Sequence, residues 1–215
     1  MVTLRRKSDA VGLAAGLIAF AVSGAIAARG MVVGEAGLFV AINSLTDWFY
    51  YAIWPFMQFG VFLTIPILVV IALVMRRVRL ATAMAIGGVG VYLLALVAKG
   101  IVDRDRPAAL LTGVETRETF VFGSLGFPSG HAAVAAALTV VVTPYLSGRW
   151  RYVPVALLAV VLVGRPYVGA HLPLDLVGGA ALGVAAGSAA NLIVGVSAPA
   201  ESMTAGEPRE EPATE

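Results

Sequence analysis

Runs of uncharged, mostly apolar residues limit what this 215-residue chain can fold into. A bilayer core of about 30 Å is crossed by roughly 20 helical residues, and several runs approach that length. Because the chain is 59% hydrophobic and only 13% charged, it has too few polar residues for an ordinary soluble domain. The sequence therefore predicts an all-α integral membrane bundle of six transmembrane helices, near residues 11–28, 55–75, 80–98, 128–148, 152–164 and 174–198.

The first of these runs has two interpretations. Arg5, Arg6 and Lys7 precede it, as basic residues precede the apolar part of a cleaved signal peptide. Its length and the missing small-x-small exit favour a helix that is retained.

The positions of arginine and lysine indicate the orientation of the bundle. If the N-terminus is cytoplasmic, the inner segments hold eight basic residues in short loops or next to the ends of spans, which is the positive-inside pattern. The sequence thus predicts a multi-pass protein of the cell membrane with both termini in the cytoplasm. The eight residues are Arg5, Arg6, Lys7, Arg76, Arg77, Arg79, Arg149 and Arg151.

One membrane domain, residues 1–198, is expected to precede a short tail. Residues 199–215 are polar, acidic and contain proline, so they cannot bury enough apolar area to fold, and we expect a disordered cytoplasmic tail. Residues 35–47 are expected to form a surface helix on the outer side. The formal net charge is only +2, which makes a nucleic-acid partner improbable, and the absence of cysteine excludes a thiolate nucleophile.

Three polar segments interrupt the apolar pattern near the outer ends of the predicted spans. They are KGIVDRDRP (99–107), PSGH (128–131) and GRPYVGAHLPLD (164–175). The first two flank the loop between spans three and four, and the third joins spans five and six. The predicted topology therefore places all three on one face of the membrane.

The residue types in these segments are those of a phosphate pocket. Lys99, Arg106 and Arg165 supply cations, and a guanidinium matches the geometry of phosphate oxygens. Ser129 and Gly130 open a helix, where backbone N–H groups and the helix dipole favour an anion. We expect these five residues to bind phosphate.

Two histidines complete the set. Cleavage of a phosphate ester without a metal needs one group that attacks phosphorus and one that protonates the leaving oxygen. Asp175 follows His171 by four residues at the start of the sixth span, so its carboxylate can reach one nitrogen of that imidazole. The spacing predicts His171 as the nucleophile, Asp175 as the residue that orients it, and His131 as the general acid.

At this point the sequence resembles the type 2 phosphatidate phosphatase superfamily, membrane lipid phosphatases related to the vanadium haloperoxidases. Lys99 through Arg106-Pro107 corresponds to the first motif of that family, Pro128 through His131 to the second, and Arg165, His171 and Asp175 to the third. The resemblance implies a phosphohistidine on His171. One position departs, because Gly164 stands where the third motif has serine, and a backbone N–H is expected to substitute for the hydroxyl.

Other charged residues of the outer side have more ordinary interpretations. Arg104 and Arg117 are expected to be solvated or to contact lipid headgroups. Asp103 and Asp105 are expected to form local ion pairs with neighbouring arginines, the alternative being a metal site.

The predicted function is that of a membrane phosphatase acting on the terminal phosphate of a lipid phosphate or polyprenyl diphosphate at the extracytoplasmic face. No metal or other cofactor is expected, and the partners are the lipid substrate and the bilayer. Phosphatidate, phosphatidylglycerophosphate and polyprenyl diphosphate all remain open as substrates. Lipid phosphotransfer at the same site and an anion-binding transporter are the alternatives, and the oligomeric state is left open.

Overall fold

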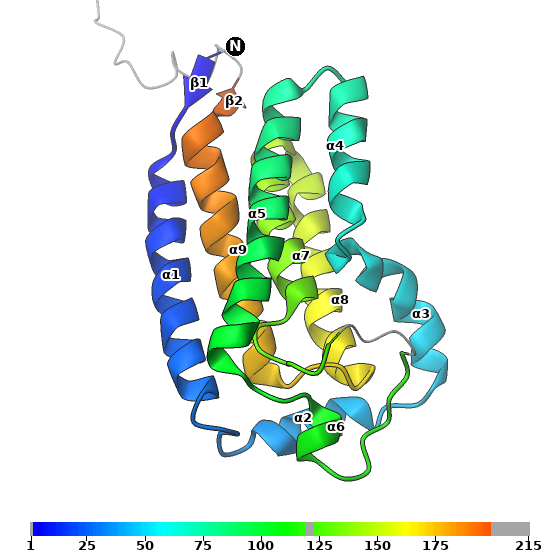
Figure 1. The fold of residues 1–215 in the computed structure, drawn as a ribbon. Coiled ribbons are helices and arrows are strands. Elements are labelled where there is room, and N and C mark those ends of the chain that lie inside the picture. Colours follow the sequence, from blue (N-terminus) through cyan, green and yellow to red (C-terminus); the bar gives the residue numbers. More distant parts are fainter. Residues whose placement is uncertain (1, 119–122, 199–215) are drawn as a thin grey trace, which may run out of the picture.

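The computed structural model describes residues 2–118 and 123–198. The predicted tail, 199–215, therefore lies outside the described residues. The described chain is mostly helical, which confirms an all-α architecture (Figure 1). Its elements are β1 (Val2–Leu4), α1 (Lys7–Ala27), α2 (Glu35–Asn43), α3 (Trp48–Met57), the 3₁₀ helix η1 (Gln58–Gly60), α4 (Thr64–Val74), α5 (Val78–Val102), α6 (Pro107–Leu110), α7 (Gly130–Val142), the 3₁₀ helices η2 (Thr143–Tyr145) and η3 (Gly148–Arg151), α8 (Tyr152–Tyr167), α9 (Pro173–Val194) and β2 (Val196–Ala198).

The helices differ in their ability to span a membrane. Three of them, α1, α5 and α9, are long and apolar enough to do so by themselves, and α3–η1 with α4 makes a fourth candidate bent by 68°. Helix α7 with η2 is apolar but shorter, and α8 has 16 residues. The structure thus supports a multi-pass membrane protein, and the count of six spans stays a prediction.

The second predicted span, 55–75, is not one continuous helix. The chain passes from η1 into an extended residue, Val61, before α4 begins. The break lets Gly60 pack directly on α7, since a Cβ atom at Gly60 would lie 2.6 Å from the carbonyl oxygen of His131. Because Gly60 has no side chain, the end of η1 can contact the first turn of α7, which contains His131.

Helix α7 lies at the centre of the bundle and packs closely on α9. Its residues 132–137 are fully buried. On α9, the facing positions Gly179, Gly183 and Gly187 have no room for a side chain, because a Cβ atom at Gly187 would lie 2.7 Å from the carbonyl oxygen of Ala137. Small residues at intervals of four let two helix backbones approach each other in a membrane protein. This contact holds the starts of α7 and α9, which belong to two of the three polar segments, close together.

The two ends of the bundle differ in character (Figure 1). Strand β1 pairs antiparallel with β2 at one end, beside the N-terminus, and we call this the strand end. There Arg6 forms an ion pair with Asp9 at 2.7 Å, and Asn191 of α9 donates a hydrogen bond to the same carboxylate. Helices α2 and α6 lie at the opposite end, which we call the motif end because α5 and α8 finish there and α7 and α9 begin there. Surface helix α2 agrees with the helix predicted within 35–47.

The orientation of the bundle can be tested by labelling, because the chain has no cysteine. Arg149 is exposed near the strand end, and a Cβ atom at Gly37 of α2 would meet no heavy atom within 4 Å. We expect single variants Gly37→Cys and Arg149→Cys to react with an impermeant thiol reagent from opposite sides of the membrane, with Gly37→Cys labelled from outside. Labelling of Gly37→Cys only from the cytoplasm would invert the predicted orientation.

Candidate active site

A pocket of about 550 Å³ at the motif end brings the three polar segments together. Its polar part is lined by Lys99, Arg106, Gly130, His131, Arg165 and His171. Its apolar part is lined by side chains of α3, the η1–α4 break, α5 and α7, among them Trp54, Phe62, Tyr92, Leu96 and Val134. The predicted convergence of these segments is therefore seen in the structure, and the pocket combines cations and imidazoles with an apolar wall.

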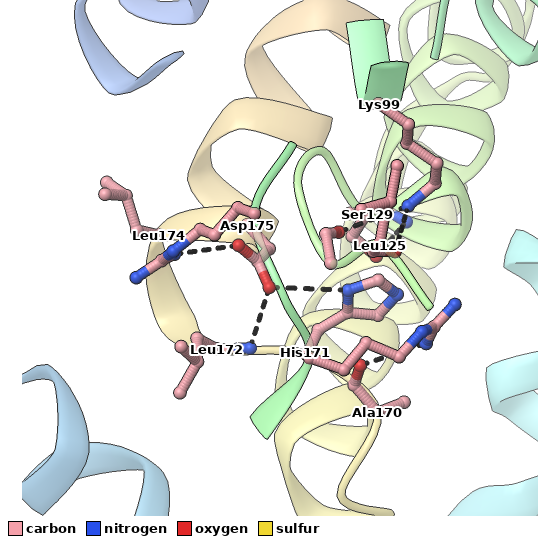
Figure 2. A network of polar contacts seen from close by, with 12 residues as sticks. Lys99, Leu125, Ser129, Ala170, His171, Leu172, Leu174 and Asp175 are labelled. Carbon is pink, nitrogen blue, oxygen red and sulfur yellow. Dashed lines mark hydrogen bonds and ion pairs between the residues drawn. The ribbon is translucent and has the colours of Figure 1, made fainter. Parts of the chain in front are cut away.

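His171 and Asp175 meet at the start of α9. Pro173 occupies the first turn of this helix, where its missing N–H costs no hydrogen bond. The Nδ1 atom of His171 lies 3.5 Å from Oδ2 of Asp175, and both residues are buried, with 3% and 0% exposure (Figure 2). At this distance the imidazole and the carboxylate interact electrostatically and do not form a short hydrogen bond. The pairing inferred from the four-residue spacing is present, and it leaves the other ring nitrogen free of this carboxylate.

The surroundings of His171 favour its neutral form. Burial lowers the pKa of this imidazole well below its usual value, and the charges of Arg165, Lys99 and Arg106 lower it further. A neutral imidazole has a lone pair on one ring nitrogen, which is what a nucleophile requires. Burial thus favours the protonation state that the predicted role of His171 requires.

His131 enters the same pocket from the first turn of α7. Among residues 2–118 and 123–198 it forms no ion pair with a carboxylate. Its position on the pocket wall agrees with the predicted general acid, whose task requires access to the leaving group.

Main-chain carbonyl groups orient two of the three predicted phosphate-binding cations. Lys99 Nζ donates to the carbonyl oxygen of Leu125 at 2.8 Å (Figure 2) and to that of Gly126 at 3.2 Å. Arg106 donates to the carbonyl oxygens of Gly123 and Ala170 at 3.0 and 3.1 Å. Burial and the nearby charge of Arg165 lower the pKa of Arg106. Positive charges held this close to one another make the pocket attractive to a multiply charged anion.

Arg165 is held by a residue that the sequence did not single out. Its Nη1 atom lies 2.8 and 2.7 Å from the two carboxylate oxygens of Glu118, which also lines the pocket. Glu118 belongs to none of the three polar segments, so the sequence carries no local signal for this contact. A phosphate that binds Arg165 has to displace or share this carboxylate.

The second polar segment is placed differently from the prediction. Ser129 is fully buried, its N–H donates to the carbonyl oxygen of Asp175 at 2.9 Å, and its hydroxyl accepts the N–H of Ala132 at 3.5 Å as the helix N-cap. Gly130 lines the pocket, but Ser129 is not among the lining residues. The Ser129 N–H predicted to meet phosphate instead joins the start of α7 to α9.

Arg104 and Arg117 are neither solvated nor exposed to headgroups, so those expectations were wrong. Arg104 is 4% exposed and forms ion pairs with Glu35 at 2.6 Å and with Asp175 at 2.8 Å. Arg117 stacks over the ring of Tyr167 at 4.4 Å and donates to the carbonyl oxygens of Asn43 and Tyr167. Both arginines join the outer connections to the helices, and their partners are distant in sequence.

The two aspartates of the first segment do not form the expected ion pairs among the described residues. Asp103 ends α5 in the left-handed conformation, and the backbone of Asp105 forms an isolated bridge with Leu125. Within residues 2–118 and 123–198 there is no group of three or more histidine or acidic side chains arranged for a metal ion. The prediction of no metal remains a prediction.

Gly164 has a packing explanation. A Cβ atom at this position would overlap the side chain of Met57, at the end of α3. Serine would therefore require Met57 to move, whereas glycine lets α8 and α3 pack closely.

Three comparisons with known proteins bear on this site. The chain is similar to crystal structures of LpxE from Aquifex aeolicus (22% identity over 74% of this chain and 98% of that one) and of a transmembrane PAP2-type phosphatidylglycerolphosphate phosphatase from Bacillus subtilis (21% identity over 82% and 94%), each with a TM-score of 0.67. At these identities the likeness shows a shared fold. A comparison with curated protein sequences found no match.

The sequence model of the PAP2 superfamily matches residues 76–197. This region is more than half of the chain and includes α5, α7, α8 and α9 with all three polar segments. The chain belongs to the PAP2 superfamily.

Proposed function

We propose that this protein is a membrane phosphatase that removes the terminal phosphate of a lipid phosphate or polyprenyl diphosphate through a phosphohistidine on His171. The observation that carries the proposal is the composition of the pocket, where two imidazoles and three cations lie beside an apolar wall. Membership of the PAP2 superfamily supports it, as does the likeness in fold to a protein named as a phosphatidylglycerolphosphate phosphatase.

In the first step, the ring nitrogen of His171 that faces away from Asp175 attacks phosphorus. The bond between phosphorus and the leaving oxygen breaks, and His131 gives that oxygen a proton. Lys99, Arg106 and Arg165 lie around the same pocket and neutralise the charge on the transferring phosphoryl group.

In the second step, water replaces the lipid product. His131, now neutral, takes a proton from the water molecule as its oxygen attacks phosphorus, and the bond to His171 breaks. Inorganic phosphate leaves, and both histidines return to their starting states. Transfer to an acceptor other than water would follow the same route with an alcohol in the place of water.

A lipid substrate is favoured by the apolar wall of the pocket. Aromatic and aliphatic side chains, including Phe62, Tyr92 and Leu96, line the cavity together with the catalytic candidates. A free sugar phosphate has no apolar group to place there, whereas an acyl or prenyl chain removes that wall from water. We propose that the site lies at the extracytoplasmic face of the cell membrane, as the distribution of basic residues predicts.

Chelation and vanadate test this proposal together. Three fixed cations can balance the charge of the transition state, so activity is expected to survive excess EDTA. Vanadate adopts a trigonal-bipyramidal form when it is bonded to a nucleophile and is expected to inhibit competitively. The measurement is phosphate release from phosphatidate, phosphatidylglycerophosphate and a polyprenyl diphosphate, beside anion flux in liposomes. Turnover that stops in EDTA and returns with magnesium would contradict the histidine mechanism, and anion flux without phosphate release would favour a transporter.

A further inference from the structure

Asp175 belongs to a buried ion network, which consists of Glu35, Arg104 and Asp175. Nη1 of Arg104 lies 2.8 Å from Oδ1 of Asp175 and 3.1 Å from Oε1 of Glu35, while Nη2 lies 2.6 Å from Oε2 of Glu35. The three side chains are at most 3% exposed. Ionised groups that are removed from water this completely require one another, because each would otherwise be left uncompensated.

This ion network determines which oxygen of Asp175 faces His171. Arg104 occupies Oδ1, and the N–H of Leu172 donates to Oδ2 at 3.0 Å (Figure 2). Oδ2 is also the oxygen that lies 3.5 Å from Nδ1 of His171. With both oxygens held, the carboxylate has one orientation, and it is the orientation that meets the imidazole.

Glu35 orients Arg104 and connects the ion network to the first turn of α9. Its two oxygens bind two nitrogens of the guanidinium, an arrangement that restricts the rotation of a planar group. Its Oε1 atom also accepts the N–H of Leu174 in the first turn of α9 at 2.9 Å. Helix α2, which contributes no lining residue to the site pocket, is thereby connected to the residues that hold His171.

The charge of the ion network affects the proposed reaction as well as its geometry. Two carboxylates surround one guanidinium, so the buried group retains one net negative charge. A histidine that attacks phosphorus gains positive charge, which a nearby negative charge stabilises. If Glu35 were neutral, Arg104 would fully offset Asp175, and this stabilisation would be lost.

We propose that Glu35 and Arg104 are positioning residues, which hold the Asp175 carboxylate toward His171 and keep the ion network negatively charged. This inference rests on the proposed function, since it assumes that His171 is the nucleophile. It adds Glu35, which lies on α2 outside the three motifs, and Arg104, which lies within the first polar segment but was expected to be solvated or to contact headgroups.

The test compares Glu35→Gln, Arg104→Gln and Arg104→Lys in the full-length protein, with phosphate release from a lipid phosphate as the assay. We expect Glu35→Gln and Arg104→Gln to lower kcat about 10- to 100-fold, the range known for residues that orient metal-bound histidines. KM is expected to change less than about threefold, because neither side chain lines the pocket. Arg104→Lys keeps the charge without the planar fork and is expected to retain intermediate activity.

A double-mutant cycle separates positioning from general destabilisation. If Arg104 acts through Asp175, adding Arg104→Gln to Asp175→Asn is expected to lower kcat by less than about threefold further. Effects of the two changes that multiply in full would overturn the proposal, as would wild-type kcat in both Arg104→Gln and Glu35→Gln.

The matched control is Arg6→Gln, which breaks the Arg6–Asp9 ion pair at the strand end. It removes the same charge far from the pocket and is expected to leave kcat and KM within about twofold. If Arg104→Gln does not fold, Glu35→Gln decides alone, since its amide keeps the shape of the side chain. An inactive His171→Ala protein beside fully active Glu35 and Arg104 variants would sink this inference and leave the proposed function standing, whereas an active His171→Ala protein would overturn the proposed function itself.

Discussion

Replacing His171 by alanine is expected to lower lipid phosphate hydrolysis by at least about 10³-fold, because no covalent intermediate can form without the attacking nitrogen. The side chain is buried between Asp175 and the pocket, and no second imidazole is paired with a carboxylate in the described part of the chain. The measurement is phosphate release under single-turnover conditions, with thermal unfolding as the control for folding. Near-normal rates in this variant would contradict the assignment of the nucleophile.

His131→Ala supplies the internal comparison for that result. A general acid matters only when the leaving oxygen needs a proton, so the loss is expected to be large for a lipid phosphate and much smaller for an aryl phosphate. His171→Ala is expected to fail equally with both substrates. If the two variants responded in the same way to the leaving group, the division of roles between the histidines would be wrong.

Asp175→Asn is expected to lower kcat by about 10²-fold or more while KM changes little, as when the carboxylate of a catalytic triad becomes an amide. The amide keeps the size of the side chain, and Arg104 keeps its ion pair with Glu35, so the fold is expected to persist. What disappears is the negative charge 3.5 Å from Nδ1 of His171. Steady-state kinetics across a range of lipid concentrations test this expectation.

A purely structural role of Asp175 would give a different result in this variant. If Asp175 only capped α9, its replacement would lower stability and the amount of active enzyme, and each folded molecule would turn over normally. Active-site titration with vanadate counts the competent molecules and distinguishes the two cases. Normal turnover per competent site would contradict the positioning of His171 by Asp175.

Residue type and spacing were sufficient to find much of the candidate site. His171 and Asp175 are four residues apart in one local turn, so their contact follows from the geometry of a helix start. Lys99, Arg106, His131 and Arg165 come from separate segments, but each precedes or follows an apolar run. Because such runs alternate in direction across a bilayer, their order along the chain already predicts which ends meet.

Local sequence placed Arg106 in the phosphate pocket but did not predict that Arg104 is buried. Both lie in one short turn, yet Arg106 lines the pocket and Arg104 is buried behind Asp175. The partners of Arg104 are 69 and 71 residues away, on α2 and α9. Arg117 was misjudged for the same reason, because its main-chain acceptors belong to distant helices.

The sequence by itself determined that this chain forms apolar helices, and that both histidines, Lys99, Arg106 and Arg165 gather at one end of them. These properties follow from the transfer of apolar residues out of water, which depends on composition along each run. Only the tertiary structure decided that Ser129 joins two helices, that Glu118 holds Arg165 and that Glu35 and Arg104 stand behind Asp175. Burial removes water from each charged group, so its partner is whichever opposite charge the packed helices bring within about 3 Å, at any separation along the chain.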